Sequence, residues 1–135
     1  MVKLQATEVL EGPQVTRGTV KGVEVKRITP IGKSEEDSFN ILEFEFTNLE
    51  GPIRDVLGSR NLTVGLACDA LNHQTALGIL ARDTFGWDGV SELDPEDFVG
   101  SELEFFVVFE ETPKGSFWNI DRKSLGVLGH LADRQ

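Results

Sequence analysis

Apolar and polar residues alternate along several stretches of this chain, and the alternation predicts a protein built mainly of β-strands. In the segment that begins at Phe39, three apolar residues alternate with Glu43 and Glu45. This pattern is typical of an antiparallel strand with one buried face. The same argument predicts five strands, namely Val15–Ile28, Phe39–Thr47, Asn61–Cys68, Ser101–Glu111 and Ser116–Asp121.

Between the third and fourth strands the period changes. Apolar residues from Asp69 to Thr84 fit helical spacing, and Asp69 is a suitable N-cap. His73 is then expected on the surface of this helix, and Gly78 weakens it. The last two strands are separated only by a Thr-Pro-Lys-Gly turn, which predicts a hairpin.

The predicted order is three strands, a helix and two strands. This is the order of the five-stranded oligonucleotide/oligosaccharide-binding barrel, the OB-fold, although other α+β arrangements share it. A chain of 135 residues suits a single domain. We expect residues 1–14 to form a loose N-terminal arm and residues 124–135 a C-terminal tail.

Aromatic residues alternate within the predicted strands in the manner of a core. Phe44, Phe46, Phe105 and Phe109 are therefore expected to pack inside rather than to contact a ligand. The strand Ser101–Glu111 has apolar residues on both faces, which predicts that both faces are covered.

Cysteine and signal patterns indicate the compartment. Cys68 is the only cysteine, so the chain forms no internal disulfide and no cysteine zinc cluster. The N-terminal residues lack the layout of a secretory signal, and no apolar stretch approaches the roughly 20 residues of a membrane span. We therefore expect a cytoplasmic protein without a membrane partner.

Charge is distributed unevenly. The formal net charge is −10, yet residues 1–33 carry +3 while ten acidic residues and no basic ones lie between Asp83 and Glu111. An acidic face of this kind usually keeps a protein soluble. A second interpretation is that it imitates a nucleic acid and contacts a basic protein.

Catalytic motifs are missing from the sequence, including the phosphate-binding loop, the zinc-protease motif and the nucleophile elbow. His73 and His130, the two histidines, lie far apart in the chain. The acidic residues from Asp88 to Asp97 do not follow the spacing of an EF-hand loop. We therefore expect no enzymatic activity, no cofactor and no metal site.

Basic and aromatic residues fall where an OB-fold binds single-stranded nucleic acid, with cations along the phosphates and rings against the bases. Trp118 and Phe117 point to opposite faces of one strand, so at most one of them faces a ligand. The candidate contacts are Lys21, Lys26, Arg27, Lys33, Arg60, Lys114 and Arg122 for phosphates, and Phe39, Phe117 and Trp118 for bases.

Three short segments, Phe85–Gly89, Asp97–Gly100 and Lys114–Asn119, resemble the C-terminal half of small phage-encoded single-stranded DNA-binding proteins. The strand Phe39–Phe46 agrees in outline as well, and the resemblance covers about residues 17–123. It implies an OB-fold without enzymatic activity that binds single-stranded DNA in phage replication or recombination. Replication or recombination proteins are the implied partners. In this family a lysine is common at the position of Ser101, so one positive charge is missing here.

Two other functions fit the sequence. The chain could be an acidic protein-interaction module that mimics DNA and inhibits a host nucleic-acid enzyme, or a structural accessory protein of a phage. A homodimer formed through exposed strand edges is also compatible with the pattern.

Overall fold

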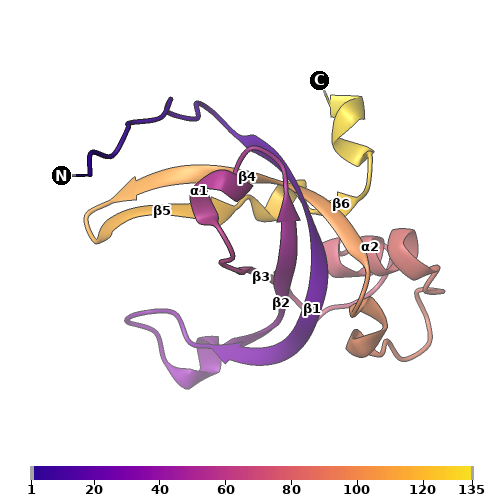
Figure 1. The fold of residues 1–135 in the computed structure, drawn as a ribbon. Helices are drawn as coiled ribbons and strands as arrows, with labels where there is room; N and C mark the ends of the chain where they lie inside the picture. The colour runs from indigo at the N-terminus through magenta and orange to yellow at the C-terminus, as the bar shows by residue number, and fades with distance from the viewer. Residues whose placement is uncertain (1, 135) are drawn as a thin grey trace.

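The computed structural model describes residues 2–134, which form a mainly β fold with one longer α-helix (Figure 1). The strands are β1 (Gln14–Ile28), β2 (Phe39–Glu50), β3 (Leu62–Ala67), β4 (Glu102–Thr112), β5 (Gly115–Ile120) and β6 (Gly126–Val127). The helices are α1 (Arg54–Leu57) and α2 (Ala76–Phe85), with short 3₁₀ turns η1 (Glu35–Asp37), η2 (Pro95–Phe98), η3 (Arg122–Ser124) and η4 (His130–Arg134).

One six-stranded antiparallel sheet contains all the strands. Its order is β3-β2-β1-β4-β5, and β6 pairs with β4. The long, curved β1 lies at the centre, because residues 14–19 pair with β4 while residues 17–28 pair with β2 (Figure 1). Some Cα atoms of β3 and β5 lie within 8 Å of each other. Backbone pairing does not join these two strands, so the sheet is not closed.

An irregularity in β1 explains why its valines do not follow one parity. The pairing of β1 with β2 shifts register between Val20 and Gly22. Val20 therefore pairs with Phe46 and Val23 with Phe44, and both valines lie on the core side of the sheet. The inserted residue is Lys21, whose side chain is exposed on the other side. Such a bulge also bends the strand, in agreement with the curvature of β1.

Aromatic side chains from three elements meet in the core. Phe44, Phe46, Phe98 and Phe105 are fully buried. The Phe44 and Phe98 ring centroids lie 5.0 Å apart, and those of Phe46 and Phe105 lie 4.8 Å apart. The prediction that Phe109 belongs to this core is wrong, since its side chain is 48% exposed. The second half of β4 extends beyond the body of the protein, so the expectation that β4 is covered on both faces holds only for its first half.

The mainly β class and the helix between the third and fourth strands are confirmed. The strand bounds agree with the prediction to within three residues. Among the α-helices and strands, two were not predicted, the short helix α1 and the two-residue strand β6. Both are too short to produce a periodic pattern of apolar residues.

The predicted start of the helix at Asp69 is wrong. The helix α2 begins at Ala76, and Thr75 is its N-cap, with its hydroxyl oxygen accepting a hydrogen bond from the Gly78 amide at 3.2 Å. Asp69 instead accepts two hydrogen bonds from Asn40, one from the backbone amide and one from the side chain, both at 2.8 Å. It therefore ties the end of β3 to the start of β2.

His73 does not lie on the helix as expected. It lies in the segment before α2, with its Nε2 2.8 Å from the Trp87 carbonyl oxygen. Its ring also contacts the Trp87 ring edge-on, with centroids 5.6 Å apart. His73 thus fixes the segment after α2 against the segment before it.

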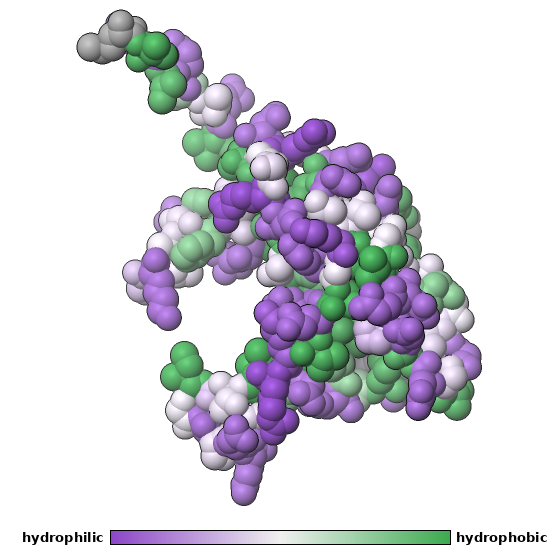
Figure 2. Space-filling model, turned by 60° about the horizontal axis from the view of Figure 1, so that its bottom comes forward, coloured by the Kyte–Doolittle hydropathy of each residue, from purple (hydrophilic) through white to green (hydrophobic). Residues whose placement is uncertain are grey.

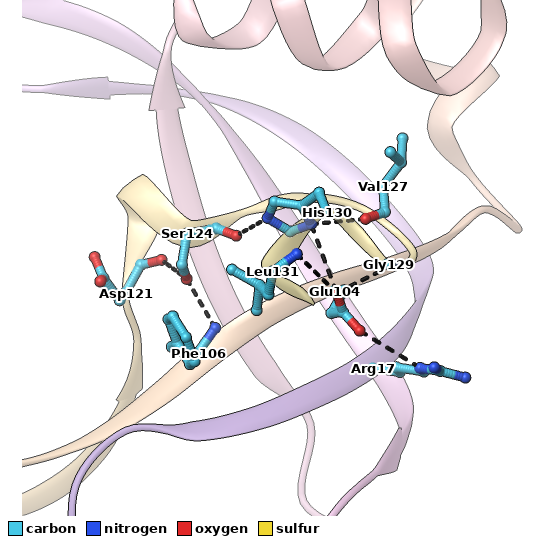
Figure 3. A network of polar contacts seen from close by, with 9 residues as sticks. All are labelled: Arg17, Glu104, Phe106, Asp121, Ser124, Val127, Gly129, His130 and Leu131. Atoms are coloured by element: carbon cyan, nitrogen blue, oxygen red, sulfur yellow. Dashed lines mark hydrogen bonds and ion pairs between the residues drawn. The ribbon is translucent and has the colours of Figure 1, made fainter. Parts of the chain in front are cut away.

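The C-terminal segment packs on β4 around a buried carboxylate (Figure 3). Glu104 Oε2 accepts hydrogen bonds from the backbone amides of Gly129, at 3.1 Å, and Leu131, at 3.2 Å. Glu104 Oε1 lies 3.7 Å from Arg17 Nε. The other nine acidic residues between Asp83 and Glu111 are exposed. Glu104 therefore departs from the expected solvated acidic face.

Candidate nucleic-acid interface

A hollow opens on one side of the molecule, between two lobes (Figure 2). The β1–β2 connection, residues 29–38, and the β4–β5 hairpin project from the same side of the body and form these lobes (Figures 1 and 2). The hairpin turn consists of Pro113 and Lys114 between the two paired strands. The connection contains the 3₁₀ turn η1. Each of these segments contains one of the predicted phosphate contacts, Lys33 in the connection and Lys114 in the hairpin turn.

Two aromatic rings lie side by side on the hairpin. Phe109 and Trp118 are directly opposite each other in the pairing of β4 with β5, and their ring centroids are 5.0 Å apart. Phe109 is two residues beyond the buried Val107, so it lies on the same face of β4. The core-facing side of the hairpin therefore continues out of the body with these two rings. The sequence did not indicate Phe109 as a contact for bases, because this residue continues the alternation of the buried residues in β4.

Phe117 lies on the other face of the same hairpin. It pairs with Glu110, one residue away from the Phe109–Trp118 pair. Because neighbouring residues of a strand point to opposite faces, Phe117 points to the outer face of the hairpin. Its side chain is 47% exposed, nearly the same as that of Phe109. Of the two adjacent aromatic candidates, Trp118 is therefore the one on the core-facing side of the hairpin, and the expectation that the two lie on opposite faces is confirmed.

Basic residues are present on both lobes. Lys114 lies in the hairpin turn, while Lys33 lies in the β1–β2 connection, and both are exposed. Arg27 pairs with Asn40 and lies on the core-facing parity of β1, two residues after Val25. One Arg27 guanidinium nitrogen donates to the Glu35 carbonyl oxygen at 3.4 Å. This contact holds the arginine against the connection.

The outer face of the β1–β2 sheet differs from the prediction. Lys26 Nζ lies 2.9 Å from Glu43 Oε1, and Lys21 Nζ lies 4.0 Å from Glu45 Oε2. The hydrogen bond and charge of Glu43 raise the pKa of Lys26 above its ordinary value. Phe39 is also on this outer face, opposite Ile28. These three predicted contacts therefore do not face the hollow, and the two lysines are paired with carboxylates.

The remaining predicted residues lie elsewhere. Arg60 lines a separate pocket beside Arg17 and Arg54, two arginines that the sequence did not single out. They are scattered along the chain, and only the fold brings them together. Arg122 belongs to η3 and lines a shallow pocket against α2. Lys33 and Lys114 thus lie on the two segments that flank the hollow, and Arg27 and Trp118 lie on the core-facing side of the strands that lead to them. The other six candidates lie on the outer faces of strands or in the two pockets.

Cys68 follows β3 and is partly buried. Burial, and to a smaller extent the charge of Asp69, raise the pKa of its thiol, so the protonated form persists at neutral pH. Among residues 2–134, no three or more His, Cys, Asp or Glu side chains gather in a way that could hold a metal ion. No helix in the described part of the chain is long and apolar enough to cross a membrane.

Comparison of the chain with protein-family models, with curated proteins and with solved structures found no match. The site is therefore interpreted from its own geometry.

Proposed function

We propose that this chain is an OB-fold protein that binds single-stranded DNA in the hollow between the β1–β2 connection and the β4–β5 hairpin. It acts as a binding protein and not as an enzyme. The resemblance to phage single-stranded DNA-binding proteins supports a role in phage replication or recombination, in the cytoplasm of the host.

The sheet topology supports the OB-fold. Its strand order, with β1 shared between two halves and the helix α2 between β3 and β4, is that of a five-stranded, partly open Greek-key barrel. The strands β3 and β5 approach each other as the two strands on either side of the opening do in such a barrel. In OB-folds the loops after β1 and β4 flank the ligand.

The observation that carries the proposal is the aromatic pair on the hairpin, a half-exposed Phe109 beside a partly buried Trp118. Phe109 is 48% exposed, so a ligand that covers its ring would gain part of the roughly 1.5–3 kcal/mol that full burial of such a side chain is worth. Bases stack on aromatic rings with a gain of about 1–3 kcal/mol each. The proposal puts the Phe109–Trp118 pair against the bases in the hollow and the exposed Lys33 and Lys114 of the two lobes against the phosphates.

A fluorescent oligothymidine of about 30 nucleotides, titrated with the protein at several salt concentrations, tests the proposal. We expect binding to the single strand and much weaker binding to a duplex of the same length. We expect three phosphate contacts, from Arg27, Lys33 and Lys114. The logarithm of the association constant should therefore fall linearly with the logarithm of the salt concentration, with a slope of about −2. Failure to bind the oligothymidine at low salt would overturn the proposal.

A second candidate function is supported by the nine exposed acidic residues between Asp83 and Glu111. A protein that imitates DNA would present these carboxylates to a basic nucleic-acid enzyme of the host. This alternative would be favoured if the protein inhibits a purified DNA enzyme and does not bind oligothymidine. If excess single-stranded DNA sequesters the protein and abolishes the inhibition, the result would instead favour the single-stranded DNA-binding function.

A further inference from the structure

A second basic site lies on the outer face of the sheet, away from the predicted base contacts of the hairpin. It is a pocket of about 500 Å³ where the first part of β1, the end of β2 and the β2–β3 connection meet. Three arginines line it, Arg17 from β1, Arg54 from α1 and Arg60 from the segment before β3. A cluster of three guanidinium groups is unusual in a chain with a net charge of −10.

The backbone explains how the pocket forms. Asn48 has a φ of 52°, a left-handed conformation, at a register shift in the pairing of β1 with β2. Gly58, with a φ of 63°, ends α1 and turns the chain back toward β3. The first irregularity bends the end of β2, and the second positions the β2–β3 connection above it. Arg54 and Arg60 lie on either side of the Gly58 turn.

The arginines are available to an anion. Neither Arg54 nor Arg60 forms an ion pair with the described residues. Arg17 contacts Glu104 only through Nε, at 3.7 Å, and its side chain is 53% exposed. Glu50 and Glu102 also line the pocket, so its lining carries one net positive charge.

Polar groups complete the lining. Thr19, Thr47, Asn48 and Ser59 also line the pocket, and their side chains carry hydroxyl and amide groups. Guanidinium groups bind phosphate oxygens in pairs of parallel hydrogen bonds, and hydroxyl and amide donors satisfy the remaining oxygens. A volume of about 500 Å³ lies within the range of small-molecule sites.

We propose that this pocket binds a phosphate group carried by a nucleotide or by a nucleic-acid strand. Arg54 and Arg60 bind the phosphate oxygens, while Arg17, held by Glu104, closes the pocket on the side of β1. The proposal concerns a surface separate from the hollow, and it stands whether or not single strands bind there.

The test uses the full chain labelled with ¹⁵N, with inorganic pyrophosphate, thymidine monophosphate and thymidine as probes. We expect the two phosphate compounds to shift the arginine Nε–H signals and the Ser59 amide signal in a saturable way, whereas thymidine leaves them unchanged. Arg54→Gln and Arg60→Gln should each weaken binding about tenfold. Arg82→Gln, which removes a charge of the same kind from α2, is the matched control and should have no effect.

Absence of saturation with pyrophosphate and thymidine monophosphate up to about 10 mM would overturn the proposal. An equal loss of binding in Arg82→Gln would do the same, because it would show attraction to overall charge. The source of the phosphate follows from oligothymidines with and without a 5′-phosphate. If the 5′-phosphorylated strand binds more tightly, the ligand of the pocket is the end of a strand. If both strands bind equally and Arg60→Gln weakens both, the ligand is the phosphate backbone. If only the mononucleotide shifts the signals, the ligand is a free nucleotide.

Failure here is distinguishable from failure of the proposed function. Phe109→Ala should leave pyrophosphate binding unchanged, since the ring lies on the hairpin and does not line the pocket.

Discussion

Glu104 shows how one residue determines the position of a whole segment. Its carboxylate is buried, and it accepts hydrogen bonds from two backbone amides of the C-terminal segment while facing Arg17 on the other side (Figure 3). His130 reinforces this arrangement, because its two ring nitrogens contact the carbonyl oxygens of Val127 and Ser124 at 2.6 and 2.5 Å.

Glu104→Ala should lower the free energy of unfolding by about 3 kcal/mol, because it leaves the two amides and Arg17 without their acceptor. Glu104→Gln keeps an acceptor oxygen and should cost roughly half as much. Urea denaturation of the two variants and the wild type measures both values. Glu92 is an exposed acidic residue. If Glu104→Ala lowers the free energy of unfolding no more than Glu92→Ala does, this role of Glu104 is contradicted.

Asp69 gives a pH dependence of known sign. Hydrogen bonds from the Asn40 backbone amide and side chain hold the pKa of Asp69 below its ordinary value of 3.8. Since the pKa is lower in the folded state, the interaction stabilises the protein above the ordinary value and is lost as the pH falls through the folded value. Asp69→Asn should therefore unfold at a lower temperature than the wild type at pH 7. The difference should shrink as the pH falls below 3.8, and a difference that stays constant as the protein is acidified would be inconsistent with this assignment.

At the scale of elements, α2 depends on a close approach that its sequence does not reveal. A glycine in a helix costs about 1 kcal/mol relative to alanine, so Gly78 suggests a weak point. In the folded protein a Cβ at Gly78 would lie 1.8 Å from the Asn72 carbonyl oxygen. The turn formed by residues 72–75 therefore packs directly on the first turn of α2, and only glycine leaves room for it.

Gly78→Ala should destabilise the protein by about 2 kcal/mol, because the clash outweighs the gain in helix propensity. Gly22→Ala is the matched control, since nothing lies within 4 Å of a Cβ there. We expect the control to change the stability by less than about 0.5 kcal/mol. Thermal unfolding measures both, and stabilisation by Gly78→Ala would show that the close contact is relieved without cost.

For the whole molecule, alternation of apolar residues was enough to predict the main strands, since each buries one face. It failed at Phe109, where β4 continues its core pattern after leaving the body, because alternation alone does not show where the core ends. It also failed at Lys21 and Lys26, whose carboxylate partners Glu45 and Glu43 come from the neighbouring strand. The pairing of the strands determines where the core ends in β4 and which carboxylates the two lysines meet. This pairing depends on a register that a single sequence does not specify.

The central claim is that the core-facing side of the β4–β5 hairpin binds the bases of single-stranded DNA. Phe109 and Phe117 are the same residue type, are 48% and 47% exposed, and lie on opposite faces of that hairpin. The most direct measurement compares oligothymidine affinity of Phe109→Ala and Phe117→Ala. We predict a loss of about tenfold for Phe109→Ala, equivalent to one stacked base, and little change for Phe117→Ala. Equal affinities of both variants and the wild type, or a loss only in Phe117→Ala, would contradict the claim.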